Sequence, residues 1–241
     1  MLAGPPFLTD DPDPVAFQHG ELYLATMYTH DASGTSGTLP HLEVNRGVAP
    51  DLMIHTILPY AFQQSAGSGT SRGYGDTEVG AKYRFVQQGK YCPMLGIFPL
   101  VEIPSGSVRR GLGSGHYQEF LPLWLQKSWS DWTVYGGGGY WITPGAGKQN
   151  YWFHGLVVQN QIAPRFMFGV ELNHTTATEV GGQQSLAYNL GGQYDFNEGH
   201  HLLFSCGHSL TGVANVTRYL ALQWTYGPSS AKQAPTDHTV R

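Results

Sequence analysis

The sequence RFMFGVELN, residues 165–173, alternates between apolar and mostly polar side chains. Successive side chains of a strand point to opposite faces, and Glu171 therefore lies opposite a face made of Phe166, Phe168, Val170 and Leu172. A half-buried strand of a soluble protein shows the same period of two. Most other segments of this chain, however, repeat the pattern with charge on the polar face. That combination is typical of a transmembrane β-barrel, which is apolar outside and polar inside.

Length and composition fit a single all-β domain. The 241 residues include 32 Gly, 14 Tyr and 6 Trp, but only 12% are charged, and barrels of this length commonly form one unit. The longest nearly uncharged apolar run, residues 91–101, is too short for a membrane-spanning helix, which needs about 20 residues. A barrel does not need such a run, because only alternate residues contact lipid.

The charge balance and the first residues bound the partners and the compartment. A formal net charge of -4 without a Lys/Arg cluster argues against nucleic acid as a partner. Cys92 and Cys206 lie far apart and leave the redox compartment open, as a pair or as buried thiols. The opening MLAGPPFLTDDPDP lacks the cationic start and apolar stretch of a secretory signal. An outer-membrane protein needs that signal, so we expect it to be missing or already cleaved from this sequence.

Twelve segments have the length and alternation of strands. Each is close to the roughly 9–11 residues that a tilted strand needs to cross a bilayer. They cover approximately 21–29, 40–47, 52–62, 76–86, 92–103, 118–129, 132–142, 151–160, 165–173, 185–196, 201–209 and 216–226.

The connections between these segments alternate between short and long. Tight turns with Pro, Asp, Asn or Gly alternate with longer Gly/Ser/Thr stretches at 30–39, 63–75, 104–117, 143–150, 174–184 and 210–215. This is the arrangement of an antiparallel up-and-down transmembrane β-barrel with short periplasmic turns and longer extracellular loops. The even strand count puts both chain ends on the periplasmic side.

The chain divides into a barrel and two flanking segments. Residues 19–227 form the predicted barrel, and residues 228–241 a polar C-terminal tail. Residues 1–18 are rich in Pro and Asp, and because Pro lacks the donor that a sheet requires, they are not a strand. They either fold into the lumen as a plug or form a disordered periplasmic tail. The candidate plug residues are Phe7, Asp10, Asp11 and Asp13.

Alternation directs most of the strand charges toward the lumen. An Arg or Lys that faces lipid at mid-depth costs about 2–4 kcal/mol, so the interior is the favourable side. These charges either select solutes or form a paired network that fills and stiffens a narrow barrel. Glu171 needs a partner, and Lys82, Arg84 or Arg218 can supply it. The candidate lumen residues are Glu21, Glu43, Glu78, Lys82, Arg84, Glu102, Glu171, Asp195 and Arg218.

Aromatic residues gather near the predicted strand ends. Tyr and Trp there are typical of the girdles at the two interfaces of a membrane barrel, although strands favour aromatic residues in general. The predicted girdle comprises Tyr60, Tyr83, Trp129, Trp132, Trp141, Tyr151, Trp152, Trp224 and Tyr226.

Short motifs with catalytic or metal-binding associations lack their structural context. The sequence GHSLT at 207–211 departs from the G-x-S-x-G elbow at its last position, and no helix follows it. His208 and Ser209 are neighbours on a strand and face apart, as do His200 and His201. The sequence GLGSG at 111–115 has no Lys for a phosphate loop. We therefore predict no enzyme activity, no metal site and no cofactor.

Five strings in order resemble a known family: GPPFLTDDPDPV, GDTEVGAKYRF, FPLVEIPSG, GLGSG and LPLWLQKSW, which begin at residues 4, 75, 98, 111 and 121. They are similar to the family of outer-membrane transporters named for the meta-pathway of phenol degradation, over about residues 4–227. The resemblance implies an outer-membrane barrel that passes aromatic or other hydrophobic small molecules. Members of the family carry a signal sequence, which we expect to be missing or already cleaved from this sequence.

The pattern and the resemblance together predict an outer-membrane channel for passive uptake of small hydrophobic or aromatic solutes. Its partners are the lipid bilayer and the solute. The alternatives are a barrel-shaped enzyme that acts on lipid, and a structural or soluble ligand-binding barrel. The identity of the solute, the oligomeric state and whether the lumen is open are not determined by the sequence.

Overall fold

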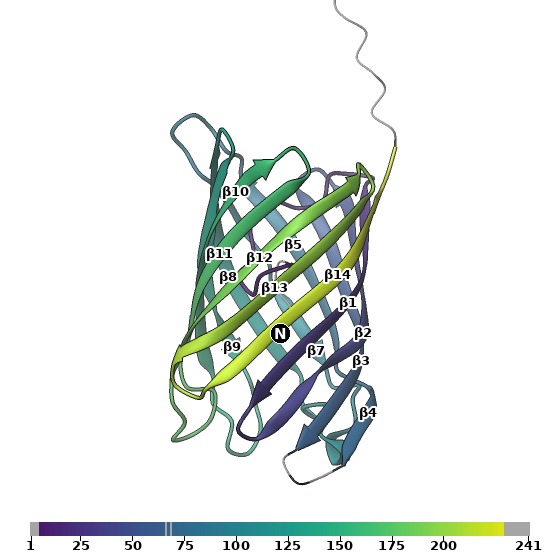
Figure 1. The fold of residues 1–241 in the computed structure, drawn as a ribbon, viewed down its shortest axis with the longest axis vertical. Coiled ribbons are helices and arrows are strands. Elements are labelled where there is room, and N and C mark those ends of the chain that lie inside the picture. The colour runs from purple at the N-terminus through teal and green to yellow at the C-terminus, as the bar shows by residue number, and fades with distance from the viewer. Residues whose placement is uncertain (1–4, 66, 68, 229–241) are drawn as a thin grey trace, which may run out of the picture.

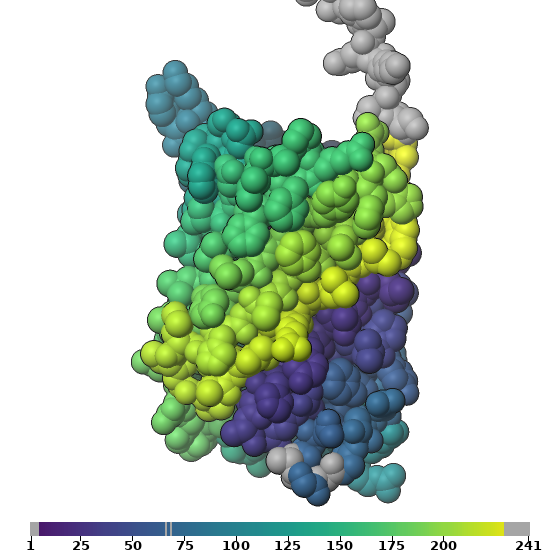
Figure 2. Space-filling view, viewed as in Figure 1, coloured from purple at the N-terminus to yellow at the C-terminus, as the bar shows by residue number. Residues whose placement is uncertain are grey.

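Twelve antiparallel strands close into an up-and-down barrel in the computed structural model, which describes residues 5–65, 67 and 69–228 (Figure 1). The barrel closes where β1 (Gly20–Asp31) pairs with β14 (Asn215–Tyr226) along the full length of both strands. Figure 2 shows this seam, with β14 in yellow lying along β1 in purple. The predicted fold class, an all-β antiparallel barrel of about twelve strands, is confirmed.

Two of the twelve strands are interrupted. The segments β4 (Thr70–Tyr74) and β5 (Thr77–Val86) both pair with β3 and together form one strand. The segments β6 (Met94–Ile97) and β7 (Leu100–Ile103) both lie between β5 and β8, and Pro99, which has no N–H to donate, marks the break. The other strands are β2 (Gly34–Ala49), β3 (Leu52–Ser65), β8 (Gln118–Trp129), β9 (Trp132–Ile142), β10 (Tyr151–Ala163), β11 (Phe166–Thr175), β12 (Ser185–Asn197) and β13 (His200–Thr211).

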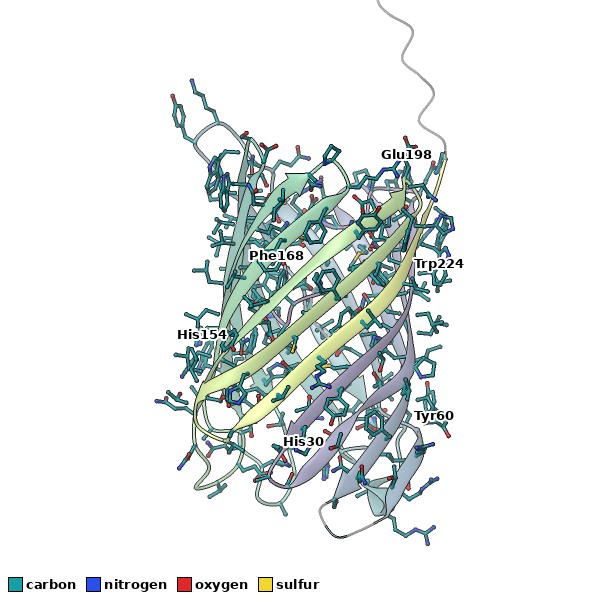
Figure 3. All side chains as sticks on the ribbon, in the orientation of Figure 1. His30, Tyr60, His154, Phe168, Glu198 and Trp224 are labelled. Atoms are coloured by element: carbon teal, nitrogen blue, oxygen red, sulfur yellow. The ribbon has the colours of Figure 1, made fainter. Side chains whose placement is uncertain are left out.

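The two ends of the barrel differ in their connections. Short turns, the first residue of β1 and the last residue of β14 share one end, where Glu198 lies; His30 lies toward the opposite end (Figure 3). At that opposite end residues 104–117 form a loop that contains the 3-10 turn η1 (Val108–Arg110). Within the described residues, no helix is long and apolar enough to span a membrane.

Three of the predicted long loops are shorter than expected. Only residues 32–33 separate β1 from β2, only 66–69 separate β3 from β4, and only 212–214 separate β13 from β14. Their Gly, Ser and Thr content is typical of loops. The backbone nevertheless continues the ladder there, with Gly37 paired to Tyr28 and to Phe62. These hairpins therefore extend beyond the predicted strand ends.

The outer face of the barrel is apolar, as the alternation predicts. In β11, Val170 and Leu172 are each 45% exposed on the outside, whereas Glu171 and Asn173 are buried inside. The same division recurs around the barrel, where Tyr60 and Trp224 lie at the outer edge in Figure 3. Further exposed apolar side chains are Leu121, Leu123, Leu125, Leu156, Leu190, Leu220 and Leu222.

Two members of the predicted aromatic girdle lie on the inner side of the barrel wall: Trp141 is buried there, and Tyr151 is partly buried against it. Trp141 is buried in the interior, stacked on Phe120 at a centroid distance of 4.8 Å, and Tyr151 stacks on Trp141 at 6.1 Å. Residues 136–139 are four glycines, so the alternation carries no side-chain signal just before Trp141. The exposed members of the predicted girdle are Tyr60, Tyr83, Trp129, Trp132, Trp152 and Tyr226.

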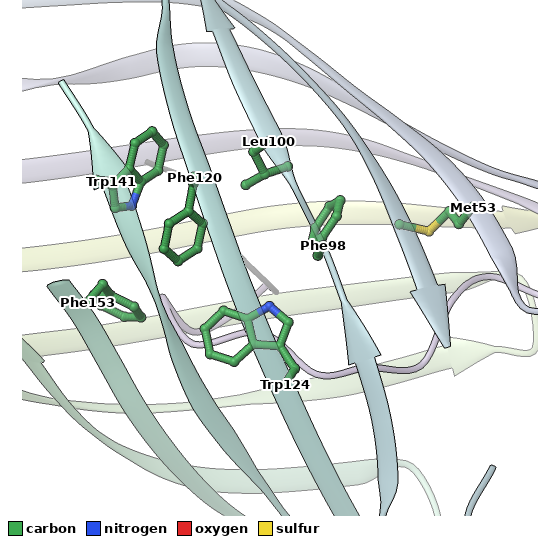
Figure 4. Close-up of a cluster of buried hydrophobic side chains, with 7 residues drawn as sticks. All are labelled: Met53, Phe98, Leu100, Phe120, Trp124, Trp141 and Phe153. Atoms are coloured by element: carbon green, nitrogen blue, oxygen red, sulfur yellow. The ribbon is translucent and has the colours of Figure 1, made fainter. Parts of the chain in front are cut away.

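Packed side chains occupy much of the barrel interior. On one wall, β9 and β10 contribute Trp141 and Phe153 to a cluster that Figure 4 shows in full; its other members are Met53, Phe98, Leu100, Phe120 and Trp124. A smaller cluster on the wall at the β1–β14 seam consists of Tyr23, Ala25, Leu203, Tyr219 and Ala221.

Candidate functional site

Residues 5–19, which we call the lumen segment, precede the first strand, and the part from residue 6 to residue 15 lies inside the barrel (Figure 1). Phe17 forms a parallel bridge with Gly47 of β2, and Gln18 N–H donates to the Gly47 carbonyl at 3.0 Å. From this anchor the chain extends into the lumen, where Phe7 and Asp10 are buried. Parts of the two predicted end segments, residues 1–4 and 229–241, lie outside the described residues. Glu171 and Lys82 of the barrel wall contact the segment inside the lumen.

Glu171 of β11 binds the lumen segment on one wall. The backbone N–H and the hydroxyl of Thr9 each donate to Glu171 Oε1 at 2.6 Å, and Leu8 N–H donates to Oε2 at 3.3 Å. The amide of Asn189 on β12 also donates to Oε2. Hydrogen bonds to a carboxylate are stronger than bonds between neutral groups. Glu171 is therefore an anchor for the segment.

Lys82 and Arg84 of β5 bind the segment on another wall. Lys82 Nζ lies 2.8 Å from Asp10 Oδ1 and 3.6 Å from Asp11 Oδ1. Arg84 pairs with Asp13 of the segment and with Asp51 of the β2–β3 turn, the latter at 2.6 Å. Two basic residues of one strand thus hold three acidic residues of the segment.

The lumen segment spans the barrel between these two anchors. Passing from β5 to β11 around the wall crosses five strand pairings, through β6, β8, β9 and β10. In a twelve-stranded barrel this separation is nearly half the circumference. Asp10 and Thr9 are adjacent residues, yet they bind opposite sides. The segment therefore forms a strap across the lumen.

Two glycines of the wall make room for the strap. A Cβ at Gly155 of β10 would overlap the Thr9 hydroxyl, and one at Gly169 of β11 would lie 2.9 Å from Phe7 Cζ. Phe7 packs in a buried cluster with Tyr135 and Val157. The wall thus has no side chains at these two positions, where the segment approaches it closely.

Burial changes the pKa of two acidic residues of the segment, Asp10 and Asp13. Desolvation raises the pKa of Asp10, although the ammonium of Lys82 opposes the shift. Desolvation also raises the pKa of Asp13, with a contribution from the nearby Asp11 carboxylate and opposition from Arg84. The cations of β5 thus oppose the effect of burial on the pKa of both carboxyl groups.

A polar network covers the wall formed by β1, β2, β3 and β5. His55 lies at its centre, with Nδ1 at 2.6 Å from Asn45 Oδ1 and Nε2 at 3.1 Å from Glu78 Oε1. The Asn45 amide donates to Glu43 Oε1 at 2.9 Å, and the Tyr23 hydroxyl donates to Glu21 at 2.8 Å. Hydroxyl, amide and imidazole groups, and not Lys or Arg side chains, are thus the hydrogen-bond partners of the carboxylates in this network.

A cavity of about 360 Å³ lies beside the strap, lined by the strap, by this network and by Gln126, Thr133, Gln159 and Gln193 of the other walls. Acidic, aromatic and amide side chains line it together. They include Asp11, Glu21, Glu43, Tyr23, Phe98 and Gln223.

The structure brings most of the predicted lumen residues to the interior. Glu21, Glu43, Glu78, Lys82 and Arg84 gather around the network and the strap, and Glu171 holds the strap from β11. Two others lie apart from this group: Glu102 accepts a hydrogen bond from Gln118 at 2.7 Å, and Asp195 lies 2.6 Å from His201 Nδ1.

Two predictions about the lumen are wrong. Arg218 shares the phase of the exposed Leu220, and its guanidinium lies 5.4 Å from the ring centroid of Tyr28. It therefore lies on the outer face, where its position at the start of β14 keeps the charge near the barrel rim. The predicted partner of Glu171 is also wrong, because Leu8, Thr9 and Asn189 bind it in place of a cation.

The prediction of lumen residues omits several side chains of the site because it considers only Asp, Glu, Lys and Arg. Tyr23 and Asn45 have the same alternation phase as Glu21 and Glu43 of their strands, and His55 shares the phase of the buried Met53. The alternation therefore contains a signal for these residues, but the prediction of lumen residues considers charged side chains alone and omits them. Phe98 could not be found this way, because it lies at the break between β6 and β7.

The motifs with catalytic associations remain separated. Ser209 is buried whereas His208 is exposed, so the two neighbours face opposite sides of β13. No group of three or more His, Cys, Asp or Glu side chains that could hold a metal ion occurs in the part of the chain that the structure describes.

Comparisons with known proteins found similar barrels among solved structures. Searches with protein-family models and among curated proteins found no match. The chain is similar to the COG4313 outer membrane channel from Pseudomonas putida F1, with a TM-score of 0.74 and 17% identity over 90% of this chain and 98% of that one. It is also similar to the KdgM porin in complex with disordered oligogalacturonate (TM-score 0.60, 10% identity, 86% and 99% covered). The NanC porin gives a TM-score of 0.58 at 9% identity, with 84% and 98% covered. At these identities the likeness concerns the fold.

Proposed function

We propose that this protein is an outer-membrane channel through which small hydrophobic or aromatic solutes pass without a chemical step, and that the lumen segment acts as its plug. The observation that carries the proposal is the contrast between the two faces of the barrel. Leu156 and Val170 are exposed outside, whereas Glu78 and Lys82 are buried inside. Soluble monomers seldom expose a continuous apolar surface of this extent.

The fold neighbours support the location and the class of function. The similar barrels include an outer membrane channel and two porins. Closed barrels satisfy every backbone hydrogen bond within the sheet, which is the condition for crossing a bilayer with strands. We infer the same location for this chain.

The interior supports the solute class. Tyr23 and Phe98 line the lumen cavity together with the apolar Met53 and Leu203. Aromatic and apolar side chains in a cavity suit aromatic or other hydrophobic solutes. The resemblance to the phenol-degradation family of transporters points to the same solutes.

The direct test is solute flux through the purified full chain in liposomes. We expect phenol to enter protein-containing vesicles faster than protein-free ones, and faster than a disaccharide of greater polarity. Flux of aromatic solutes that equals the protein-free background would contradict the channel. Equal enhancement for the disaccharide would contradict the solute class and leave the channel in place.

A further inference from the structure

We propose that the lumen cavity beside the strap binds a small organic cation, a protonated primary amine carried on an apolar or aromatic body. Glu43 receives the ammonium group. The inference names a solute class for the channel proposed above and rests on that function for its biological meaning. Binding itself can be measured without transport.

Carboxylates outnumber cations in the cavity lining. The ammonium of Lys82 and the imidazole of His55 face five carboxylates: Asp10, Asp11, Asp13, Glu21 and Glu43. Lys82 pairs with Asp10 and Asp11, and Arg84, which is not part of the lining, pairs with Asp13. His55 lies 3.7 Å from Glu43 Oε1 and 3.1 Å from Glu78 Oε1, and Glu21 has no ion pair with any described residue. The cavity thus retains negative charge that favours a cation.

Glu43 provides a specific anchor for that charge. Its side chain is 2% exposed and lines the cavity. Oε1 accepts a hydrogen bond from Asn45 at 2.9 Å, but Oε2 is buried without a hydrogen-bond partner among the described residues. His55 does not supply one, since its nitrogens lie within hydrogen-bond distance of Asn45 and Glu78. An unsatisfied buried acceptor is costly, and an ammonium group has three donors to offer.

Aromatic and apolar side chains in the same lining select an organic cation over a metal ion. Tyr23, Met53, Phe98 and Leu203 line the cavity beside the carboxylates. The Phe98 ring already holds a cation, with Lys82 Nζ 5.1 Å from its centroid. No cluster of three or more metal-ligating side chains occurs among the described residues. The volume of about 360 Å³ lies within the range of small-molecule pockets, which is roughly 300–1,000 Å³.

Isothermal titration of the full chain in detergent micelles with benzylammonium chloride tests the proposal. At about pH 8 the amine is protonated and ordinary carboxylates are ionised. We expect saturable binding that Glu43→Gln weakens at least about tenfold, because the substitution removes the charge and keeps the shape. Glu119→Gln removes an exposed carboxylate that does not line the cavity, and it should bind like the parent.

Three results would overturn the proposal: no saturable binding by the parent, equal binding of uncharged benzyl alcohol, or equal binding by Glu43→Gln. If Glu43→Gln does not fold, Glu21→Gln on the neighbouring strand replaces it, with a weakening of about twofold to fivefold expected and an unchanged affinity contradicting the site. Binding without solute flux would remove the channel and keep the site. Flux without binding would remove only the site.

Discussion

Glu171 shows what a single buried carboxylate requires. Burying a charge is expensive unless hydrogen bonds or an opposite charge compensate it. The sequence predicted a cation for this purpose, but Leu8, Thr9 and Asn189 provide N–H and O–H donors. A count of charged side chains omits backbone donors, and a segment without regular structure has such donors free. The residue that began as part of a strand pattern thus fixes the position of the N-terminal segment.

The two faces of the same strand lead to a prediction at the scale of one residue. Val170→Arg places a charge on the outer face near the middle of β11, where the proposed membrane location makes it cost about 2–4 kcal/mol. Leu210→Arg, equally exposed but near the end of β13, should cost about 1 kcal/mol or less. Urea titration of folding into phospholipid vesicles measures both. Equal costs for the two variants would contradict a lipid-facing β11.

At the scale of elements, the lumen segment and β10 fit each other at Gly155. Gly155→Ala puts a methyl group on the position of the Thr9 hydroxyl and should displace the segment from Glu171. Losing a hydrogen bond to a charged group costs about 1.5–3 kcal/mol. We expect the time spent in an open, higher-conductance state to rise about tenfold or more in planar bilayer recordings.

The matched control for this variant is Gly69→Ala, since a Cβ there has nothing within 4 Å. It should conduct like the parent. If Gly155→Ala also conducts like the parent while remaining folded, the segment does not limit conduction at this point.

The elements themselves were predictable to different degrees. Strand number and the direction of Leu172 or Lys82 follow from alternation, which is a local property of the chain. The extension of β2 through Gly34–Thr38 was not predictable, because glycine and threonine in a paired hairpin look like a loop. The contacts of Asp10 with Lys82 join residues that are 72 positions apart, and they depend on the register around the whole barrel. Local patterns carry no information on that register.

The whole molecule combines a barrel wall and a strap that carry opposite charges where they meet. Lys82 and Arg84 on the wall face Asp10, Asp11 and Asp13 on the strap. Without the strap Lys82 would lose both of its ion pairs, and Arg84 would keep only its pair with Asp51. If the strap is the plug that we propose, it both narrows the lumen and makes the charge of the lumen more negative.

Deletion of residues 4–14 should change conductance and ion selectivity together. The open lumen should conduct more, since the strap no longer spans it between β5 and β11. Its preference for cations should fall, because three carboxylates leave while Lys82 and Arg84 stay. Reversal potentials across a potassium chloride gradient, recorded for the parent and the deletion variant, measure the change in selectivity. Heat-dependent mobility in detergent gels confirms that the variant barrel is folded. A folded variant with the parent's conductance would contradict the plug, and one with higher conductance but unchanged selectivity would separate the blocking role of the strap from its electrostatic role.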